Sequence, residues 1–127
     1  MPNEEKPIES VSPGAAITPP ASAEADPLLR KGWSNYAAGD FDEAILQFEA
    51  ARRLTPDDPE PAYGLGLSFK MFGRKQQAAV AFREAAALAD RLENRTRATM
   101  LRRLALAHVN HLERGQWDLE REVWGRA

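Results

Sequence analysis

The apolar residues of this chain recur at intervals of three and four residues, which is the spacing of amphipathic helices. The first such stretch follows Asp26-Pro27, where a carboxylate can cap a helix and a proline suits its first position, and Gly39 ends it. Asp58-Pro59 and Gly73 give the same start and stop signals one stretch later. The pattern predicts five helices: from Pro27 to Gly39, through the stripe from Phe41 to Leu54, from Pro59 to Gly73, through Ala78 to about Leu88, and from about Glu93 to Arg114. A further helix is expected after Gly115.

The predicted helices form a repeat with a period of 34 residues. The segment that begins at Gly39 returns at Gly73, and an alanine, a phenylalanine and a second alanine return with it. These pairs are Ala44 and Ala78, Phe48 and Phe82, and Ala51 and Ala85. The next glycine of this kind, Gly115, follows after 42 residues, and the eight extra residues are about two helical turns. A fixed period indicates a unit that stacks on itself, so we expect a third unit with a longer first helix.

The repeat divides the chain into two parts. Residues 1–25 combine five prolines with serine, alanine and acidic residues, contain no aromatic residue, and are expected to be a disordered tail. Residues 26–127 are expected to form a helical repeat domain with units at about 25–58, 59–92 and 93–127. The predicted fold is all-α, a short α-solenoid of about three antiparallel helix pairs behind the tail.

The composition removes several classes of function. The chain has no cysteine, which excludes disulfides, thiolate metal sites and a cysteine nucleophile. Its formal net charge of −2 gives no general attraction to nucleic acid or to a membrane. It has neither an apolar run of roughly 18 to 20 residues nor the basic and apolar regions of a secretory signal, so we expect it in the cytoplasm. Because it also lacks a glycine-rich phosphate loop and a nucleophile with a plausible base, we expect neither an enzyme nor a cofactor.

These features resemble the tetratricopeptide repeat, a 34-residue unit of two antiparallel helices with the pattern W-x2-L-G-x2-Y, then A-x3-F, then P. The first unit matches this pattern at Gly32, Ala44, Phe48 and Pro56, and the second unit at Leu65, Gly66, Phe69, Ala78 and Phe82. The third unit keeps Leu104 and Trp124 and departs at most other positions, as terminal repeats often do. On these residues the chain is identified as a small, bacterial-type member of the tetratricopeptide repeat family.

The resemblance implies a concave groove, lined by the first helix of each pair, that binds a protein or peptide partner. The groove positions that the family pattern assigns here include Leu29, Trp33, Tyr36, Tyr63, Leu67, Lys70, Arg102 and Val109, with Glu60 at a further one. We expect Trp33, Tyr36 and Tyr63 to be the anchors, because aromatic side chains give a large contact area at low entropic cost, although they could instead pack against adjacent helices. The implied function is a non-catalytic protein–protein interaction module or scaffold.

Other interpretations of particular residues remain open. The Arg91–Arg103 region is basic and could bind RNA or phosphate, but it lacks interleaved aromatic residues, so nucleic acid is an unlikely partner. Trp117 and Trp124 share a predicted helix face and either cover the core or mediate homo-oligomerisation, which leaves a monomer or a weak homo-oligomer. His108 and His111 have a metal-binding spacing, but no further ligands are evident, so we predict that they pack and that no metal binds.

Overall fold

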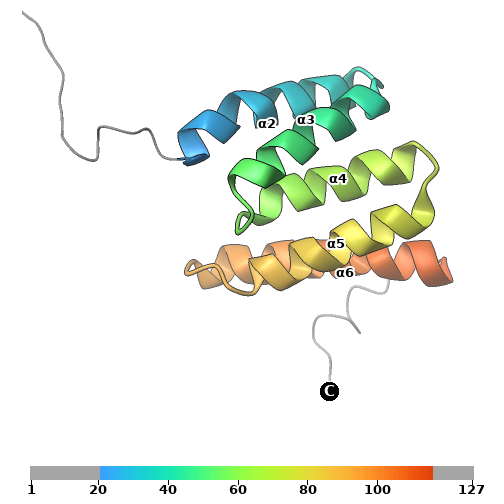
Figure 1. The fold of residues 1–127 in the computed structure, drawn as a ribbon. Helices are drawn as coiled ribbons and strands as arrows, with labels where there is room; N and C mark the ends of the chain where they lie inside the picture. The colour runs from blue at the N-terminus through green and yellow to red at the C-terminus, as the bar shows by residue number, and fades with distance from the viewer. Residues whose placement is uncertain (1–20, 116–127) are drawn as a thin grey trace, which may run out of the picture.

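The computed structural model describes residues 21–115, which form a stack of α-helices without any strand in that range (Figure 1). The helices are α2 (Ala21–Ala37), α3 (Phe41–Leu54), α4 (Pro59–Met71), α5 (Lys75–Ala89) and α6 (Arg95–Arg114). Each helix packs against the next one along the chain, so the stack follows the order of the sequence. The prediction of an all-α helical repeat is confirmed.

The ends of the helices follow the signals in the sequence. Asp58 caps α4, because its carboxylate accepts a hydrogen bond from the backbone N–H of Glu60 at 3.0 Å, and Pro59 occupies the first turn. Gly39 and Gly73 lie in the turns after α2 and α4 with φ angles of +85° and +88°, which residues with a Cβ rarely adopt. These tight turns reverse the chain direction, so consecutive helices run antiparallel.

The first helix begins earlier than the sequence pattern predicts. Helix α2 starts at Ala21, so Pro27 lies inside the helix and Asp26 does not cap it. The alanine-rich segment before Pro27 favours a helix, and Ala25 packs into the core with only 1% of its surface exposed. This burial helps to offset the backbone hydrogen bond that a proline cannot donate. The prediction of a disordered tail through residue 25 is therefore wrong for residues 21–25.

Two other expectations concern residues outside the described range. They are the disorder predicted for residues 1–20 and the helix predicted after Gly115, which would carry Trp117 and Trp124. Within the described range, none of the helices combines the length and the apolar character that crossing a membrane would require.

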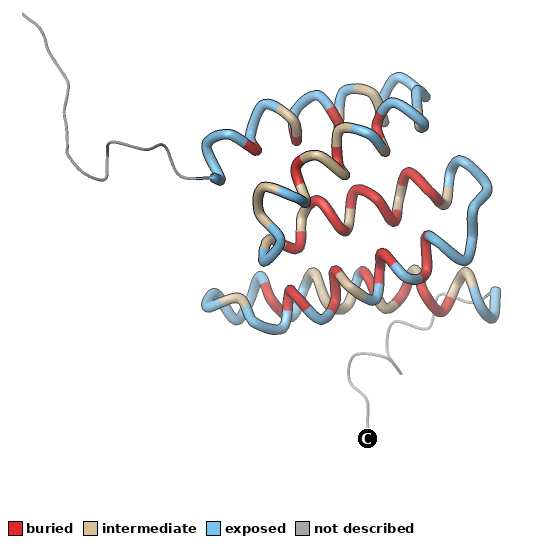
Figure 2. The backbone as a smooth tube through the Cα atoms, in the orientation of Figure 1, coloured by how far each residue is buried: buried red, intermediate tan, exposed pale blue. Residues whose placement is uncertain are grey.

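Alanine and phenylalanine side chains fill the space between the helices. The buried residues include Ala44, Phe48 and Ala51 of α3, and Ala78, Phe82 and Ala85 of α5, which are the residues that recur at the 34-residue offset. Figure 2 shows that the buried positions follow the sides of the helices that face their neighbours. The small alanines let the helix axes approach closely, and the phenylalanine rings fill the remaining space.

Each of these two phenylalanines packs against the first helices of two successive pairs. The ring of Phe48 lies so close to Gly32 of α2 and Gly64 of α4 that an added Cβ would stand 2.8 Å and 2.6 Å from it. The ring of Phe82 approaches Gly66 of α4 in the same way, with 2.6 Å to an added Cβ, and it stacks on the imidazole of His108 in α6. The phenylalanines therefore join one pair to the next as well as the two helices of a pair.

Candidate functional site

Partly exposed aromatic and polar side chains gather on the side of the stack formed by α2, α4 and α6. We call this surface the α2–α4–α6 face and define it by Trp33, Tyr36, Glu60, Tyr63, Lys70 and His108. Its residues on α4, Glu60, Tyr63 and Lys70, follow one another at intervals of three and seven positions, which places them on one side of that helix. Hydrogen bonds between the side chains connect α2 to α4 and α4 to α6.

Trp33 connects the first helix of the stack to the first helix of the second pair. Its indole Nε1–H donates a hydrogen bond to a carboxylate oxygen of Glu60 at 2.8 Å. The indole ring packs edge-on against Phe48, with ring centres 4.8 Å apart, and lies 6.0 Å from the ring of Tyr36. The core beneath and the carboxylate beside it thus hold Trp33 in one orientation, with part of the ring still open to solvent.

His108 has the corresponding position between α4 and α6. Its imidazole is stacked on Phe82, with ring centres 4.4 Å apart and an interplanar angle of 4°. The Nδ1 atom lies 3.3 Å from Nζ of Lys70, and the Nε2 atom lies 3.4 Å from the hydroxyl oxygen of Tyr63. An ammonium group can only donate, so Nδ1 accepts and the neutral ring carries its proton on Nε2, which donates to Tyr63.

The surroundings of His108 favour its neutral form. Burial, followed by the charges of Lys70 and His111, lowers the pKa of His108 to about 4. Burial also lowers the pKa of Lys70, and burial together with Tyr36 raises the pKa of Tyr63. At neutral pH the imidazole is therefore an uncharged hydrogen-bonding group beside a cation.

We expect acid to destabilise the protein through His108. In the unfolded chain this imidazole has its ordinary pKa of 6.5, whereas in the folded chain its pKa is about 4. Between these values the unfolded state binds more protons, so the free energy of unfolding falls as the pH decreases through this window. Because the ring is partly exposed, we expect His108 to account for a loss of about 1–2 kcal/mol between pH 7 and about pH 4.5.

Urea unfolding of the wild type and of His108→Gln at several pH values measures this contribution. Carboxylates titrate in both proteins, so the informative quantity is the difference in pH dependence between them. Glutamine cannot take up the proton, and the variant should lose less stability than the wild type on acidification. Equal losses in the two proteins would show that His108 is not responsible.

The eight groove residues predicted from the family pattern fall into two groups. Trp33, Tyr36, Tyr63, Leu67, Lys70 and Arg102 are partly exposed, as binding residues must be. Leu29 and Val109 are instead buried in the core, with 7% and 6% of their surface exposed, and present little area to a partner. Of the first group, Trp33, Tyr36, Tyr63 and Lys70 take part in the contacts described above. Leu67 and Arg102 do not take part in those contacts.

His108 is the member of this face that the family pattern missed. Aligning the third unit on Gly115 assigned Val109 to the groove, but Ala98, Ala105 and Val109 form the buried stripe of α6. Because this stripe faces the core, His108 lies at the edge of α6 that contacts Tyr63 and Lys70. The signal was present in the sequence, because residues 98, 105 and 109 are small or apolar at helical spacing and so indicate the side of α6 that faces the core.

The arginine-rich segment has internal partners for two of its charges. Arg91 lies 3.6 Å from the carboxylate of Asp57, and Arg95 lies 3.6 Å from that of Asp90. Arg95 also donates hydrogen bonds of 2.9 Å to the backbone oxygens of Asp90 and Leu92. These contacts order the turn between α5 and α6. In the described part of the chain, no group of three histidine, cysteine or acidic residues is placed to hold a metal ion.

Comparison with known proteins identifies the first helix pair. The family model described as tetratricopeptide repeat matches residues 25–58, which is the first predicted unit and contains most of α2 and all of α3. A comparison with curated proteins and another with solved structures found no match. The helix pair of α4 and α5 repeats the glycine, alanine and phenylalanine packing of the matched pair. Residues 25–58 therefore match the tetratricopeptide repeat, and α4 and α5 share the packing of that unit.

Proposed function

We propose that this protein is a non-catalytic interaction module that holds a peptide or helix of another protein against the α2–α4–α6 face. Tetratricopeptide repeats generally mediate protein–protein interaction. The observation that carries the proposal is that partly exposed Trp33 of α2 lies on one surface with Tyr63 and Lys70 of α4, where contacts fix their orientations.

The chemistry of this surface favours a partner segment with both apolar and polar groups. Trp33 and Tyr63 supply rigid aromatic area, which costs little side-chain entropy when it is covered. Glu60 lies near the start of α4 and Lys70 near its end, and their separation of ten positions corresponds to about 15 Å of helix. A segment that lies along α4 would therefore meet an acidic group at one end, a basic group at the other and aromatic rings between them.

The test is the double variant Trp33→Ala, Tyr63→Ala. Affinity capture from the native lysate with the full chain as bait first identifies partners, whose affinity is then measured with purified proteins. Removing both anchors should weaken binding by about 2 kcal/mol or more for each ring, so that capture is lost. Circular dichroism establishes that the variant keeps its helix content.

A matched control removes an exposed aromatic ring elsewhere. Phe72 lies just after α4, is 44% exposed and does not belong to the α2–α4–α6 face. Phe72→Ala should leave capture unchanged. If the folded double variant binds the same partner as tightly as the wild type does, the partner occupies a different surface and the proposal is wrong.

A further inference from the structure

We propose that the groove between α3 and α5 is a second binding site, which takes an extended segment of another protein with a large apolar side chain close to an arginine or lysine. This site is separate from the α2–α4–α6 face. Leu65 and Phe69, which form its floor, lie about 120–160° around α4 from Tyr63, since each residue turns the helix by about 100°. The inference therefore does not depend on the function proposed above.

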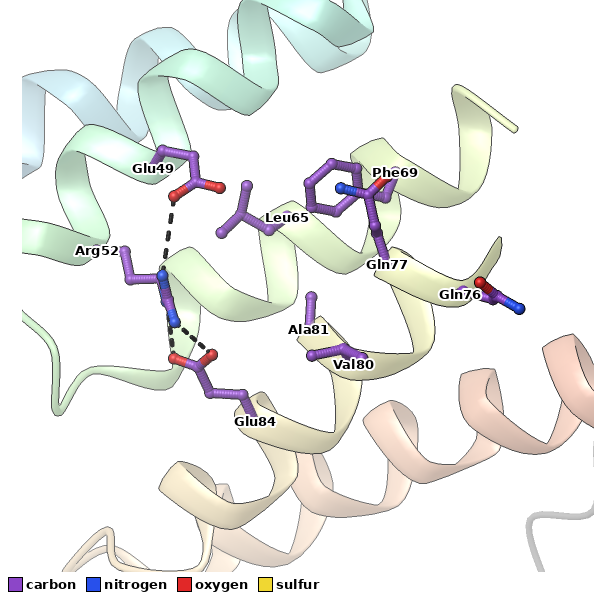
Figure 3. Close-up of a pocket in the computed structure, with 9 residues that line it drawn as sticks. All are labelled: Glu49, Arg52, Leu65, Phe69, Gln76, Gln77, Val80, Ala81 and Glu84. Carbon is purple, nitrogen blue, oxygen red and sulfur yellow. Dashed lines mark hydrogen bonds and ion pairs between the residues drawn. The ribbon is translucent and has the colours of Figure 1, made fainter. Parts of the chain in front are cut away.

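The groove has a floor from one helix and walls from two others (Figure 3). Its volume is about 320 Å³, and its lining includes Leu65 and Phe69 of α4, Glu49 and Arg52 of α3, and Val80 and Glu84 of α5. Pockets that enclose small ligands usually measure about 300–1,000 Å³, so this one has room for a large side chain rather than for an extended cofactor.

The centre of the groove is apolar and open. Val80 is 64% exposed, although it stands beside the apolar floor of Leu65 and Phe69. Leu65 and Phe69 are themselves buried, with 3% and 9% of their surface exposed, so the apolar area that a partner would remove from water is mainly that of Val80. Leu46 on the neighbouring helix α3 is equally exposed, at 61%, but does not line the groove.

The charged end of the groove has one more carboxylate than cations. Arg52 uses its Nε and Nη2 groups to bind both carboxylate oxygens of Glu84, each at 2.8 Å. The carboxylate of Glu49 approaches Arg52 only to 3.8 Å, which is too long for a hydrogen bond. All three side chains are 30–40% exposed. The excess negative charge at Glu49 is therefore accessible to a cationic group of a partner, which supplies the complementary charge.

The length of the groove limits the spacing of the two recognised groups. Gln77 lines the groove two helical turns before Glu84, a distance of about 10.5 Å along α5. An extended segment rises about 3.3 Å per residue, so about three residues cover this length. The apolar residue and the cation should therefore be no more than about three positions apart, and the Gln77 amide can bond to the backbone between them.

Fluorescein-labelled peptides of about ten residues test this inference with the full-length chain. Each peptide carries one leucine, phenylalanine or tryptophan in a glycine–serine background, with arginine, alanine or glutamate one to three positions away. Fluorescence polarisation gives the dissociation constants. Peptides with arginine should bind about threefold or more tighter than the matched alanine peptides, and peptides with glutamate should bind more weakly.

Matched variants then locate the binding. Val80→Ser should weaken the arginine peptides about tenfold, because it removes an apolar contact, while Leu46→Ser should leave them unchanged. Glu49→Arg should reverse the preference from arginine to glutamate. The variant Trp33→Ala, Tyr63→Ala should bind these peptides like the wild type, which separates this site from the α2–α4–α6 face.

Three results would overturn the proposal. They are the absence of binding by any apolar–arginine peptide, equal weakening by Val80→Ser and Leu46→Ser, and an unchanged preference in Glu49→Arg. Light scattering at several concentrations tests the alternative that a second copy of this chain occupies the groove. A dimer that Val80→Ser dissociates, together with failure of the peptides to bind, would assign the groove to self-association instead.

Discussion

Replacing Phe48 with alanine is expected to lower the free energy of unfolding by about 3–5 kcal/mol. The side chain is completely buried, and its ring lies against Gly32, Gly64 and Trp33. The two glycines have no side chains that could move into the space the ring leaves, so most of the cavity should remain. Small domains are stable by only about 5–15 kcal/mol, and this loss is a large part of that total.

Urea unfolding followed by circular dichroism measures the effect of Phe48→Ala. Phe72→Ala is the matched control, because it removes the same group from an exposed position, where Arg74 lies over the ring. The control should cost less than about 1 kcal/mol. Similar losses in the two variants would show that the contacts of Phe48 do not support the stack.

Replacing Gly66 with alanine is expected to destabilise the protein by about 1–3 kcal/mol, although alanine is the better helix former. The added Cβ would stand 2.6 Å from two ring atoms of the buried Phe82, so the ring or α4 must shift. The gain in helix propensity is at most about 1 kcal/mol and does not compensate for this overlap.

A double-mutant cycle with Phe82→Leu tests the cause. Leucine lacks the flat ring that occupies the space beside Gly66, so Gly66→Ala should cost less in the Phe82→Leu background than in the wild type. Chemical unfolding of the four proteins gives the interaction energy. A Gly66→Ala variant as stable as the wild type would mean that the contact between α4 and α5 adapts without cost.

The sequence predicted the middle of the fold better than its ends. Gly73 repeats the turn made by Gly39, and Ala78 and Phe82 repeat the buried packing of the preceding pair. Because each pair needs the same turn and the same packing, these residues recur at the period of the repeat. The start of α2 was wrong because the cap signal at Asp26-Pro27 competed with the alanines before it, and tertiary burial of Ala25 decided the outcome.

The candidate site depended on contacts between residues far apart in the chain. The family pattern placed Trp33 and Glu60 at groove positions, but it could not show that they are hydrogen-bonded, because the choice of rotamer depends on packing. The family pattern did not predict the position of His108, because it assumes that α6 presents the same side to its neighbours as α2 and α4 do. The side of α6 that meets α5 then decides which residues face α4.

The packing of Phe48 and Phe82 across pair boundaries has a consequence for cooperativity. Residues 25–58 match a complete family unit, yet Phe48 in that unit reaches its buried environment only when Gly64 of the next pair is beside it. An isolated pair would expose this ring to water, so its stability depends on its neighbour. The unit that evolution repeats is therefore smaller than the unit that unfolds, and neighbouring pairs should gain and lose structure together.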